Sequence, residues 1–459
     1  MMTGRLSQAL IALGFCGLAG AAWFAAKTPL VALALGLLPF GALFVLRMPV
    51  IVIIGFVVFS LFRIHEAYPQ LYSLRIPQLL ALAAFATIGY QLLTRRLVPF
   101  LTFELKLALA FFALVSFDVV FASNVGLAMG FWTGTYVKIA VMVFAIAWLV
   151  RRPQDLALTA RLFAVAGFLV AIVAIQNRLN GIGLVEGTRV TIGRDFGSML
   201  GDPNDLALVL LFPTSFAAAM VLRRGLGPVD RIIGLVVLVA LIFGVLYTQS
   251  RGGLLGLIGV AGVYAWNRTR NKALLIVAGG AVGAVLFMLA GVGDRSVVAA
   301  ADGVDESSMG RLYAWEAAFY MALSNPLTGV GLDNFYANYF FYSNHWDGKN
   351  HAVHSTWFGV LAEAGFLGFF VFVAFVWATV RLSMRSVAAA ERLPIRTDRS
   401  AAWIGAVREA LLAGLAGFVI SGTFLTMGFI WPVYILHALI VAADRILPDG
   451  AEDRQSQDG

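Results

Sequence analysis

The chain has 459 residues, of which 60% are hydrophobic and 13% are charged, and its mean hydropathy is +0.87. Soluble proteins carry roughly 25% charged residues, so the composition excludes a soluble protein of several domains, a disordered chain, a collagen and a coiled coil. The formal net charge is +8, which raises the question of a nucleic-acid partner. The single Cys16 excludes an internal disulfide and a cysteine-based zinc site.

Apolar runs recur from one end of the chain to the other, each of the length that crosses a bilayer as a helix. They predict an all-α polytopic membrane protein with about 12–14 transmembrane helices. The predicted spans are residues 8–26, 29–46, 48–62, 77–93, 102–122, 134–150, 157–177, 204–222, 230–248, 252–266, 273–291, 353–380, 402–422 and 427–444.

The positions of lysine and arginine predict the orientation, because cytoplasmic turns are enriched in both. With the N-terminus in the cytoplasm, most basic residues fall in cytoplasmic turns, including Arg95-Arg96, Arg151-Arg152 and Arg223-Arg224. Topology then explains the basic charge, and no nucleic-acid partner is predicted. The external side carries two longer loops, 178–203 and 292–352, whose varied composition is typical of folded loops.

We divide the chain into N-terminal transmembrane helices (1–177), a central catalytic region (178–380) that includes the external loop 292–352, C-terminal transmembrane helices (381–448) and a disordered polar tail (449–459). Within the large loop, Gly310–Leu323 has the apolar spacing of an amphipathic helix. We expect this helix to lie at the membrane interface.

Arginines at the external ends of helices are the first candidates for chemistry. Arg251, in the Ser-Arg-Gly-Gly run 250–253, lies at the mouth of a span. A lone arginine there often only reaches the interface, but a guanidinium also offers a rigid fork of donors to phosphate. Arg311 opens the interfacial helix, where its charge is unfavourable unless an anion is near. Arg189 and Arg194, in the other loop, are further candidates for this cluster.

Three histidines, His345, His351 and His354, crowd the entry to the span that begins near residue 353. No third ligand stands at a recognised spacing, so no metal is predicted. We expect His354 in the first turn of a helix, where the positive dipole end favours a neutral imidazole. Such a histidine suits a general base acting on a hydroxyl. His351 is a candidate for substrate binding.

The segment Gly-Asp-Pro-Asn-Asp at 201–205 precedes another span at the same face. Asp202 suits a helix N-cap and Pro203 the first helical position, which alone explains the segment. Asp202 and Asn204 are also candidates for binding sugar hydroxyls or for orienting an arginine. Glu363 lies inside its span, and we expect a basic partner for it on a neighbouring helix.

Three motifs, in this order, carry a resemblance to a known family. They are the run at 250–253, the Gly-Arg-x-x-x-Trp pattern at 310–315, and His354-Ser355 followed by Gly365-x-x-Gly368. With the large external loop between them, they resemble the O-antigen ligase and O-antigen or exopolysaccharide polymerase superfamily of bacterial membrane glycosyltransferases. The segment at 201–205 also recurs in exopolysaccharide-related members.

The resemblance implies a site at the periplasmic face of the bacterial inner membrane. It implies a metal-independent, inverting glycosyltransferase that needs no cofactor. Such an enzyme moves a glycan from an undecaprenyl diphosphate carrier to a hydroxyl on lipid A-core, on a second glycan or on a protein. Arg251 and Arg311 would hold the diphosphate and His354 would activate the acceptor, with Arg189 or Arg194 completing the basic cluster.

We favour a ligase of lipopolysaccharide or cell-surface polysaccharide biosynthesis, on the His354-Ser355 motif. A polymerase that joins lipid-linked repeat units is the alternative, and a protein O-oligosaccharyltransferase is a third. A transporter of lipid-linked sugars would need polar groups near the bilayer midplane, whereas most distinctive polar residues lie at the external face. A non-catalytic assembly partner would keep full glycan output after substitution of Arg251 or His354.

Overall fold

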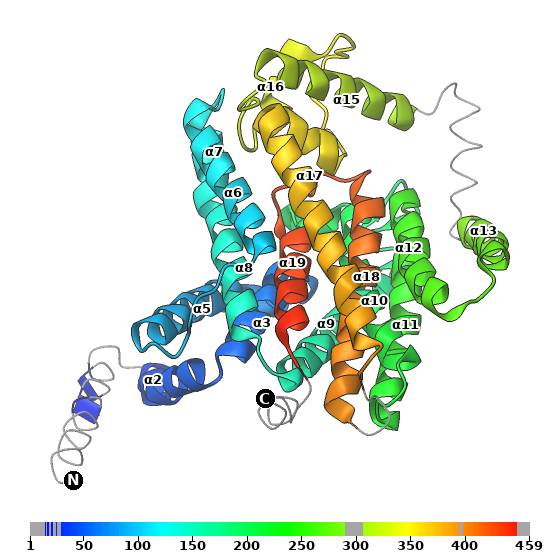
Figure 1. Ribbon diagram of the computed structural model, residues 1–459. Helices are drawn as coiled ribbons and strands as arrows, with labels where there is room; N and C mark the ends of the chain where they lie inside the picture. Colours follow the sequence, from blue (N-terminus) through cyan, green and yellow to red (C-terminus); the bar gives the residue numbers. More distant parts are fainter. Residues whose placement is uncertain are drawn as a thin grey trace.

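The computed structural model describes residues 29–289, 306–393 and 398–447, together with six positions between 14 and 24. The described chain is almost entirely helical, which confirms the predicted all-α class (Figure 1). Its regular strands in these ranges are β1 (Leu184–Val185) and β2 (Arg189–Val190), which pair antiparallel in the loop predicted at 178–203. Most of the first predicted span, residues 292–305 of the large loop, and the tail lie outside the described residues.

The N-terminal half of the described chain forms helices whose starts are often marked by proline, which suits the first turn because the N–H there has no helical partner. They are α2 (Pro29–Arg47), α3 (Pro49–Leu61), α4 (Ile64–Ala67), α5 (Ile76–Leu93), α6 (Phe103–Asp118), α7 (Val125–Phe131), α8 (Val137–Leu149) and α9 (Pro153–Asn180). Short helical turns η1 (Pro69–Leu74), η2 (Val119–Phe121) and η3 (Trp132–Tyr136) join them.

The C-terminal half begins with the short turns η4 (Arg194–Phe196) and η5 (Met199–Gly201). The helices that follow are α10 (Pro203–Leu222), α11 (Pro228–Thr248), α12 (Arg251–Arg268), α13 (Lys272–Leu289), α15 (Glu306–Ser324), α16 (Phe335–Tyr342), α17 (Thr356–Ala390), α18 (Arg399–Gly422) and α19 (Trp431–Arg445). In Figure 1, α15 and α16 lie across one end of the bundle, which we call the α15 end.

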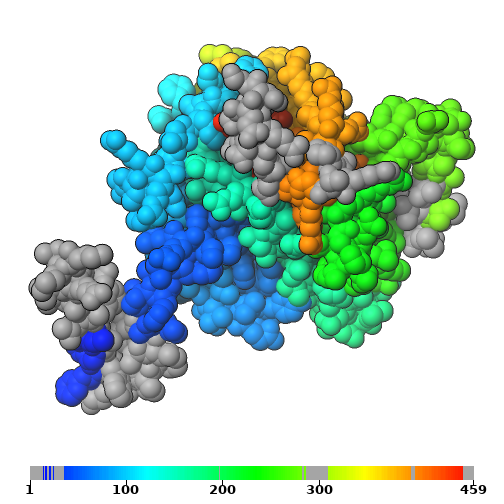
Figure 2. Space-filling model, turned by 60° about the horizontal axis from the view of Figure 1, so that its bottom comes forward, coloured from blue at the N-terminus to red at the C-terminus, as the bar shows by residue number. Residues whose placement is uncertain are grey.

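Within the described residues, seven helices are long and apolar enough to cross a membrane, or up to eight if the bent pair α2–α3 is one span. This is fewer than the roughly 12–14 predicted from hydropathy. The difference arises because several predicted spans are short helices, such as α3 with 13 residues, α6 with 16 and α19 with 15. The pair α2–α3 bends by 96°, and α2 projects from the body of the other helices (Figure 2).

The centre of the bundle is α10, which is buried along most of its length and packs against α9, α11, α12 and α18. Glycines on α12 allow this packing to be close. A Cβ on Gly253 would lie 2.5 Å from the Cβ of Ala207, and one on Gly256 would lie 2.4 Å from a methyl carbon of Leu211. The glycine at 253, two residues after Arg251, therefore serves helix packing.

The described part of the large loop folds around a small core of its own. This core contains Ala314, Ala317, Ala318, Met321, Val330, Phe335, Tyr339, Val353 and Ala362. The predicted helix at Gly310–Leu323 lies within α15, which ends at Ser324. Its buried face consists of alanines and Met321, whereas Leu312 and Phe319 are exposed.

Asn334 ties this loop to the turn between α6 and α7. Its side chain is fully buried, and its Oδ1 accepts hydrogen bonds from Ser123 Oγ (3.0 Å) and Asn124 N (2.9 Å). Its Nδ2 donates to the carbonyls of Asn124 (3.2 Å) and Leu332 (2.8 Å). A buried amide with all these partners fixes the loop, because losing any partner would leave a polar group unsatisfied.

A break in α17 at Gly365 anchors the same loop. Gly365 has φ 65° and ψ −171°, a conformation that essentially only glycine adopts. The two carbonyls before the break, of Ala362 and Glu363, accept hydrogen bonds from the N–H groups of Val330 (2.8 Å) and Gly331 (3.1 Å). The loop therefore satisfies backbone groups that a broken helix would otherwise leave exposed inside the bundle.

The expectation of a basic partner for Glu363 is wrong. Its buried carboxylate accepts hydrogen bonds from the backbone N–H groups of Asp333 (3.0 Å) and Phe335 (3.1 Å). Phe335 begins α16, so the carboxylate lies at the positive end of a helix, which stabilises a negative charge as a cation would. Glu363 thus holds the start of α16 against α17.

Gly365→Ala is expected to destabilise the protein by roughly 1–3 kcal/mol, because alanine is strained at this φ and ψ. Its Cβ would also lie 2.7 Å from the carbonyl oxygen of Pro326. The thermal unfolding midpoint in detergent measures the effect. Gly89→Ala in α5 is the control, since a Cβ there meets nothing within 4 Å. Equal midpoints for the two variants would contradict this role of Gly365.

Candidate functional site

Three helix starts meet at the α15 end of the bundle, those of α10, α12 and α17. Asp202, Ser250 and Ser355 are their N-caps, and the side chain of each accepts a backbone N–H from the turn that it caps. The predicted cap at Asp202 is confirmed. These residue types cap helices because their short oxygen-bearing side chains reach the N–H groups that lack a helical partner.

Asn204 joins the starts of α10 and α12. Its Oδ1 accepts hydrogen bonds from Ser250 Oγ (2.8 Å) and from Arg189 Nη2 (2.9 Å). Arg189 is buried, and its Nε donates to the carbonyl of Thr248 (3.2 Å) while its Nη1 lies 3.6 Å from the carboxylate of Glu186. Arg189 therefore contacts protein acceptors on both sides and holds the β1–β2 hairpin against the start of α10 and the end of α11.

The turn between α18 and α19, residues 423–430, lies against the starts of both α12 and α17. A Cβ on Gly252 would lie 3.6 Å from the Cβ of Phe424. Thr356 Oγ1 donates a hydrogen bond to the carbonyl of Leu425 (2.7 Å). Arg251 precedes Gly252, and His354 lies two residues before Thr356. Both therefore belong to segments that pack on one turn although they are far apart in sequence.

Trp315 attaches α15 to the segment before α17. Its Nε1 donates a hydrogen bond to the carbonyl of Val353 (3.0 Å), and its ring stacks on Phe358 with 5.0 Å between centroids. Arg311 lies one helical turn earlier on α15. The tryptophan of the Gly-Arg-x-x-x-Trp pattern thus fixes Arg311 relative to His354, the residue after Val353.

His354 lies just before α17, because Ser355 is the N-cap and the helix begins at Thr356. The prediction that His354 lies in the first turn of the helix is therefore wrong. Its backbone is left-handed, with a φ of 43°. Burial lowers the pKa of its imidazole below the ordinary value, the Arg311 guanidinium lowers it further, the Asp202 carboxylate raises it and His351 lowers it. The net result is an imidazole that stays neutral near pH 7, for a different physical reason from the dipole effect predicted.

Of the remaining candidate residues, two histidines pack against aromatic rings and one arginine is exposed. His351 is half-buried, packs edge-on against Tyr339 and has its Nε2 3.0 Å from the carboxylate of Asp347. His345 stacks on Tyr313, with 3.8 Å between ring centroids. Arg194 is exposed on η4, and none of the contacts described here joins it to the other candidates.

The electrostatics of this end favour an anion. Three helix N-termini, each with a positive dipole end, are grouped here, and Arg251 adds a full charge at the start of α12. Arg311 adds another, but it lies in the second turn of α15, which begins at Glu306, and does not open the helix as predicted. A neutral histidine beside them is suited to accept a proton. The fold and this arrangement define a multi-pass membrane protein with a basic site at one end of its helices.

Residues 236–373 match the model of a family described as O-antigen ligase. The match runs from α11 into α17 and contains all three motifs of the predicted resemblance, and it supports the predicted resemblance to the O-antigen ligase and polymerase superfamily. Members of this family are glycosyltransferase-like membrane enzymes of bacteria. No curated protein matches the chain.

Several residues that shape the site carry no isolated sequence signal. Ser250 and Trp315 belong to the quoted motifs, but their hydrogen bonds to Asn204 and Val353 join segments far apart in sequence. The turn at 423–430 has no distinctive polar motif and was not predicted to contribute. The signal available in the sequence was that this turn joins the predicted spans 402–422 and 427–444 at the same face.

Arg189→Gln is expected to cost about 1–3 kcal/mol of stability, because it removes the buried donors to Asn204 and Thr248. Arg194→Gln should change stability by less than about 0.5 kcal/mol, since this side chain is exposed. Thermal unfolding of both variants in detergent provides the comparison. A midpoint for Arg189→Gln equal to that of the unsubstituted protein would show that Arg189 is not part of the packing.

Proposed function

We propose that this protein is an O-antigen ligase-like, inverting and metal-independent glycosyltransferase of the inner membrane. In this proposal it moves a glycan from an undecaprenyl diphosphate carrier to an acceptor hydroxyl, in lipopolysaccharide or cell-surface polysaccharide biosynthesis. The observation that carries the proposal is the grouping of His354, Arg311 and Asp202, close enough to shift the pKa of His354, with three helix N-termini. The site would face the periplasm.

The proposed reaction is a single displacement. The acceptor oxygen bonds to the anomeric carbon on the face opposite the diphosphate, and the bond from that carbon to the diphosphate oxygen breaks. The hydroxyl proton passes to the imidazole of His354, and the electron pair of the broken bond stays on the departing lipid diphosphate. Inversion follows from attack opposite the leaving group.

The roles of the residues follow from where charge develops. Negative charge grows on the diphosphate as it leaves, so fixed guanidinium groups stabilise the transition state more than the ground state. Arg251 and Arg311 take this role, supported by the helix N-termini. Asp202, Asn204 and His351 would contact sugar hydroxyls, with Arg194 at the rim of the donor site. Arg189, predicted as part of the basic cluster, is buried against Asn204 and Thr248 and supports the site from within the fold.

The acceptor is tested by offering one labelled lipid-linked glycan together with lipid A-core, a second lipid-linked glycan or a pilin-like protein. Transfer to lipid A-core is the result expected of a ligase. Product only on the second lipid-linked glycan would make the protein a polymerase, and product on the protein would make it an oligosaccharyltransferase. Movement of the donor across proteoliposomes without glycan transfer would contradict enzymatic function altogether.

Arg251→Lys is expected to lower kcat/KM roughly 10- to 100-fold, because an ammonium does not reproduce the two-pronged contact with phosphate. His354→Ala should lower turnover about 100- to 10,000-fold while the donor Kd changes little. Transfer assays and donor binding on the same preparations separate these effects. His345→Ala is the matched control in the same loop, and equal losses in all three variants would contradict the assigned roles.

The rate is also expected to depend on the pKa of His354. A base with a lowered pKa stays neutral as the pH falls, so activity should persist below the ordinary histidine value of about 6.5. Asp202→Asn removes the carboxylate that raises this pKa but keeps an oxygen for the N-cap. The acid limb of the kcat profile should therefore move to still lower pH. A limb that stays in place, or moves upward, would contradict the role of His354 as the base.

A further inference from the structure

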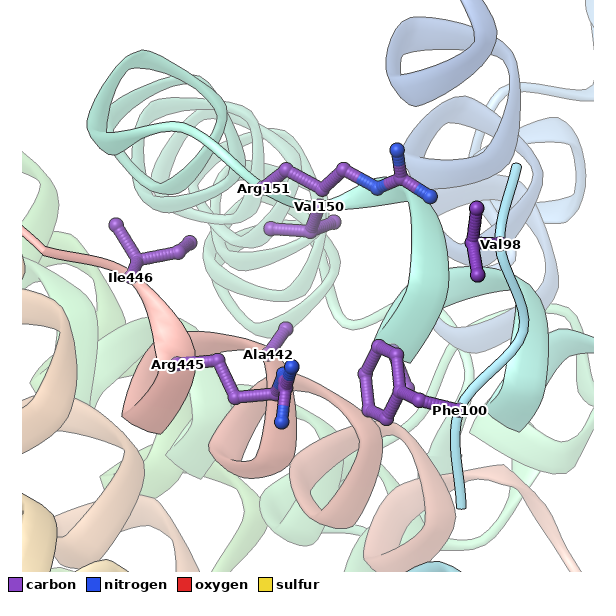
Figure 3. A pocket seen from close by; sticks show the side chains of 8 residues that line it. Val98, Phe100, Val150, Arg151, Ala442, Arg445 and Ile446 are labelled. Carbon is purple, nitrogen blue, oxygen red and sulfur yellow. The ribbon is translucent and has the colours of Figure 1, made fainter. Parts of the chain in front are cut away.

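A cavity of about 310 Å³ is lined by segments at the end of the bundle opposite α15. Figure 3 shows the cavity from close by, and Figure 1 shows the end of α19 at that end of the bundle. Three segments build it: the connection after α5, the junction of α8 and α9, and the end of α19. Its lining residues are Val98, Phe100, Ala147, Val150, Arg151, Ala442, Arg445 and Ile446. Six of these are apolar and two are arginines, so the cavity combines apolar walls with two positively charged groups.

The two arginines approach the cavity from different elements, as Figure 3 shows. Arg445 lies over the ring of Phe100, 4.1 Å from its centroid. Arg151 Nε donates a hydrogen bond to the carbonyl of Trp148 (2.5 Å), which fixes the side chain. No acidic side chain is among the described residues that line the cavity. Two positive charges that line one cavity without an acidic side chain favour an anion in it.

Other side chains cap the end of α19 and the start of α9, which lie next to these arginines. The buried Arg408 donates to the carbonyls of Ala443 (2.8 Å) and Ile446 (3.1 Å) at the end of α19. At the start of α9, the carboxylate of Asp155 accepts the backbone N–H of Arg151 (3.0 Å). The guanidinium group of Arg445 is therefore not needed for the carbonyls at the end of α19, whereas the Nε of Arg151 serves the end of α8 through Trp148 and leaves its two Nη groups for the cavity.

The cavity also adjoins an apolar surface. Val98 is 73% exposed, and Leu101 and Phe103 farther along the same segment are 48% and 65% exposed. Such residues are costly in water but not beside lipid chains. A ligand with an anionic head and apolar tails would match both parts of this surface, whereas a free anion would match the arginines alone.

We propose that this cavity binds the headgroup phosphate of an anionic phospholipid, with the phosphate between Arg151 and Arg445 and the acyl chains along Val98, Leu101 and Phe103. The site is at the end of the helices where headgroups lie when the bundle spans a bilayer. It would hold a structural or regulatory lipid in the leaflet opposite the proposed transferase site. This inference requires a membrane-spanning bundle but not the proposed reaction.

The test is native mass spectrometry of the full chain in detergent with added phosphatidylglycerol or phosphatidylcholine, in separate samples. The unsubstituted protein should retain phosphatidylglycerol in preference to phosphatidylcholine. The double variant Arg151→Gln/Arg445→Gln should lower retention of phosphatidylglycerol about tenfold or more, and each single variant should lower it less. Arg385→Gln is the matched control, since this exposed arginine of α17 does not line the cavity.

Three outcomes would overturn the proposal. They are equal retention of the two lipids, equal retention of phosphatidylglycerol by the double variant and the control, and displacement of the lipid by millimolar inorganic phosphate. The last would identify a site for free phosphate. If the double variant unfolds, lipid retention by the two single variants is the test. Each of them changes one exposed side chain and is expected to fold. The transferase assay on the same variants separates this proposal from the proposed function.

Discussion

The break of α17 at Gly365 is the constraint on which the α15 end depends. Inside a helical bundle, backbone groups that lose their helical partner must find another. Here the loop at Val330 and Gly331 supplies donors to the two carbonyls before the break, and Glu363 accepts N–H groups at the start of α16. The loop is therefore part of the helix that it contacts, and this holds α15 above the start of α17.

This anchoring explains how a histidine and an arginine from separate segments come together. Trp315 bonds to the carbonyl of Val353, so the position of α15 is set by the residue that precedes His354. The caps of α10, α12 and α17 bring three positive helix ends to the same place. A site built from helix ends and one loop is positioned by rigid elements, which suits preorganised stabilisation of a leaving anion.

The sequence predicts the features that depend on local rules. The N-cap at Asp202, the helix within the large loop and most helix positions follow from capping residues, apolar period and proline, all of which act within a few residues. The partners of Glu363 and of Arg189 could not be predicted, because the backbone of Asp333 and the side chain of Asn204 are brought to them only by tertiary packing. In the described residues, fewer helices than predicted spans are long enough to cross, because hydropathy marks apolar runs whatever the length of the helix.

The arginines illustrate the same limit and show what a structure adds. By sequence alone, Arg189 in an external loop, Arg408 inside a predicted span, and Arg151 and Arg445 at the ends of apolar runs are single charges whose partners cannot be named. Packing separates them: Arg189 and Arg408 are buried against protein acceptors, whereas Arg151 and Arg445 line a cavity at the opposite end from His354. Because a buried guanidinium must have acceptors to be stable, the location of those acceptors distinguishes an arginine that holds the fold from one that faces a ligand.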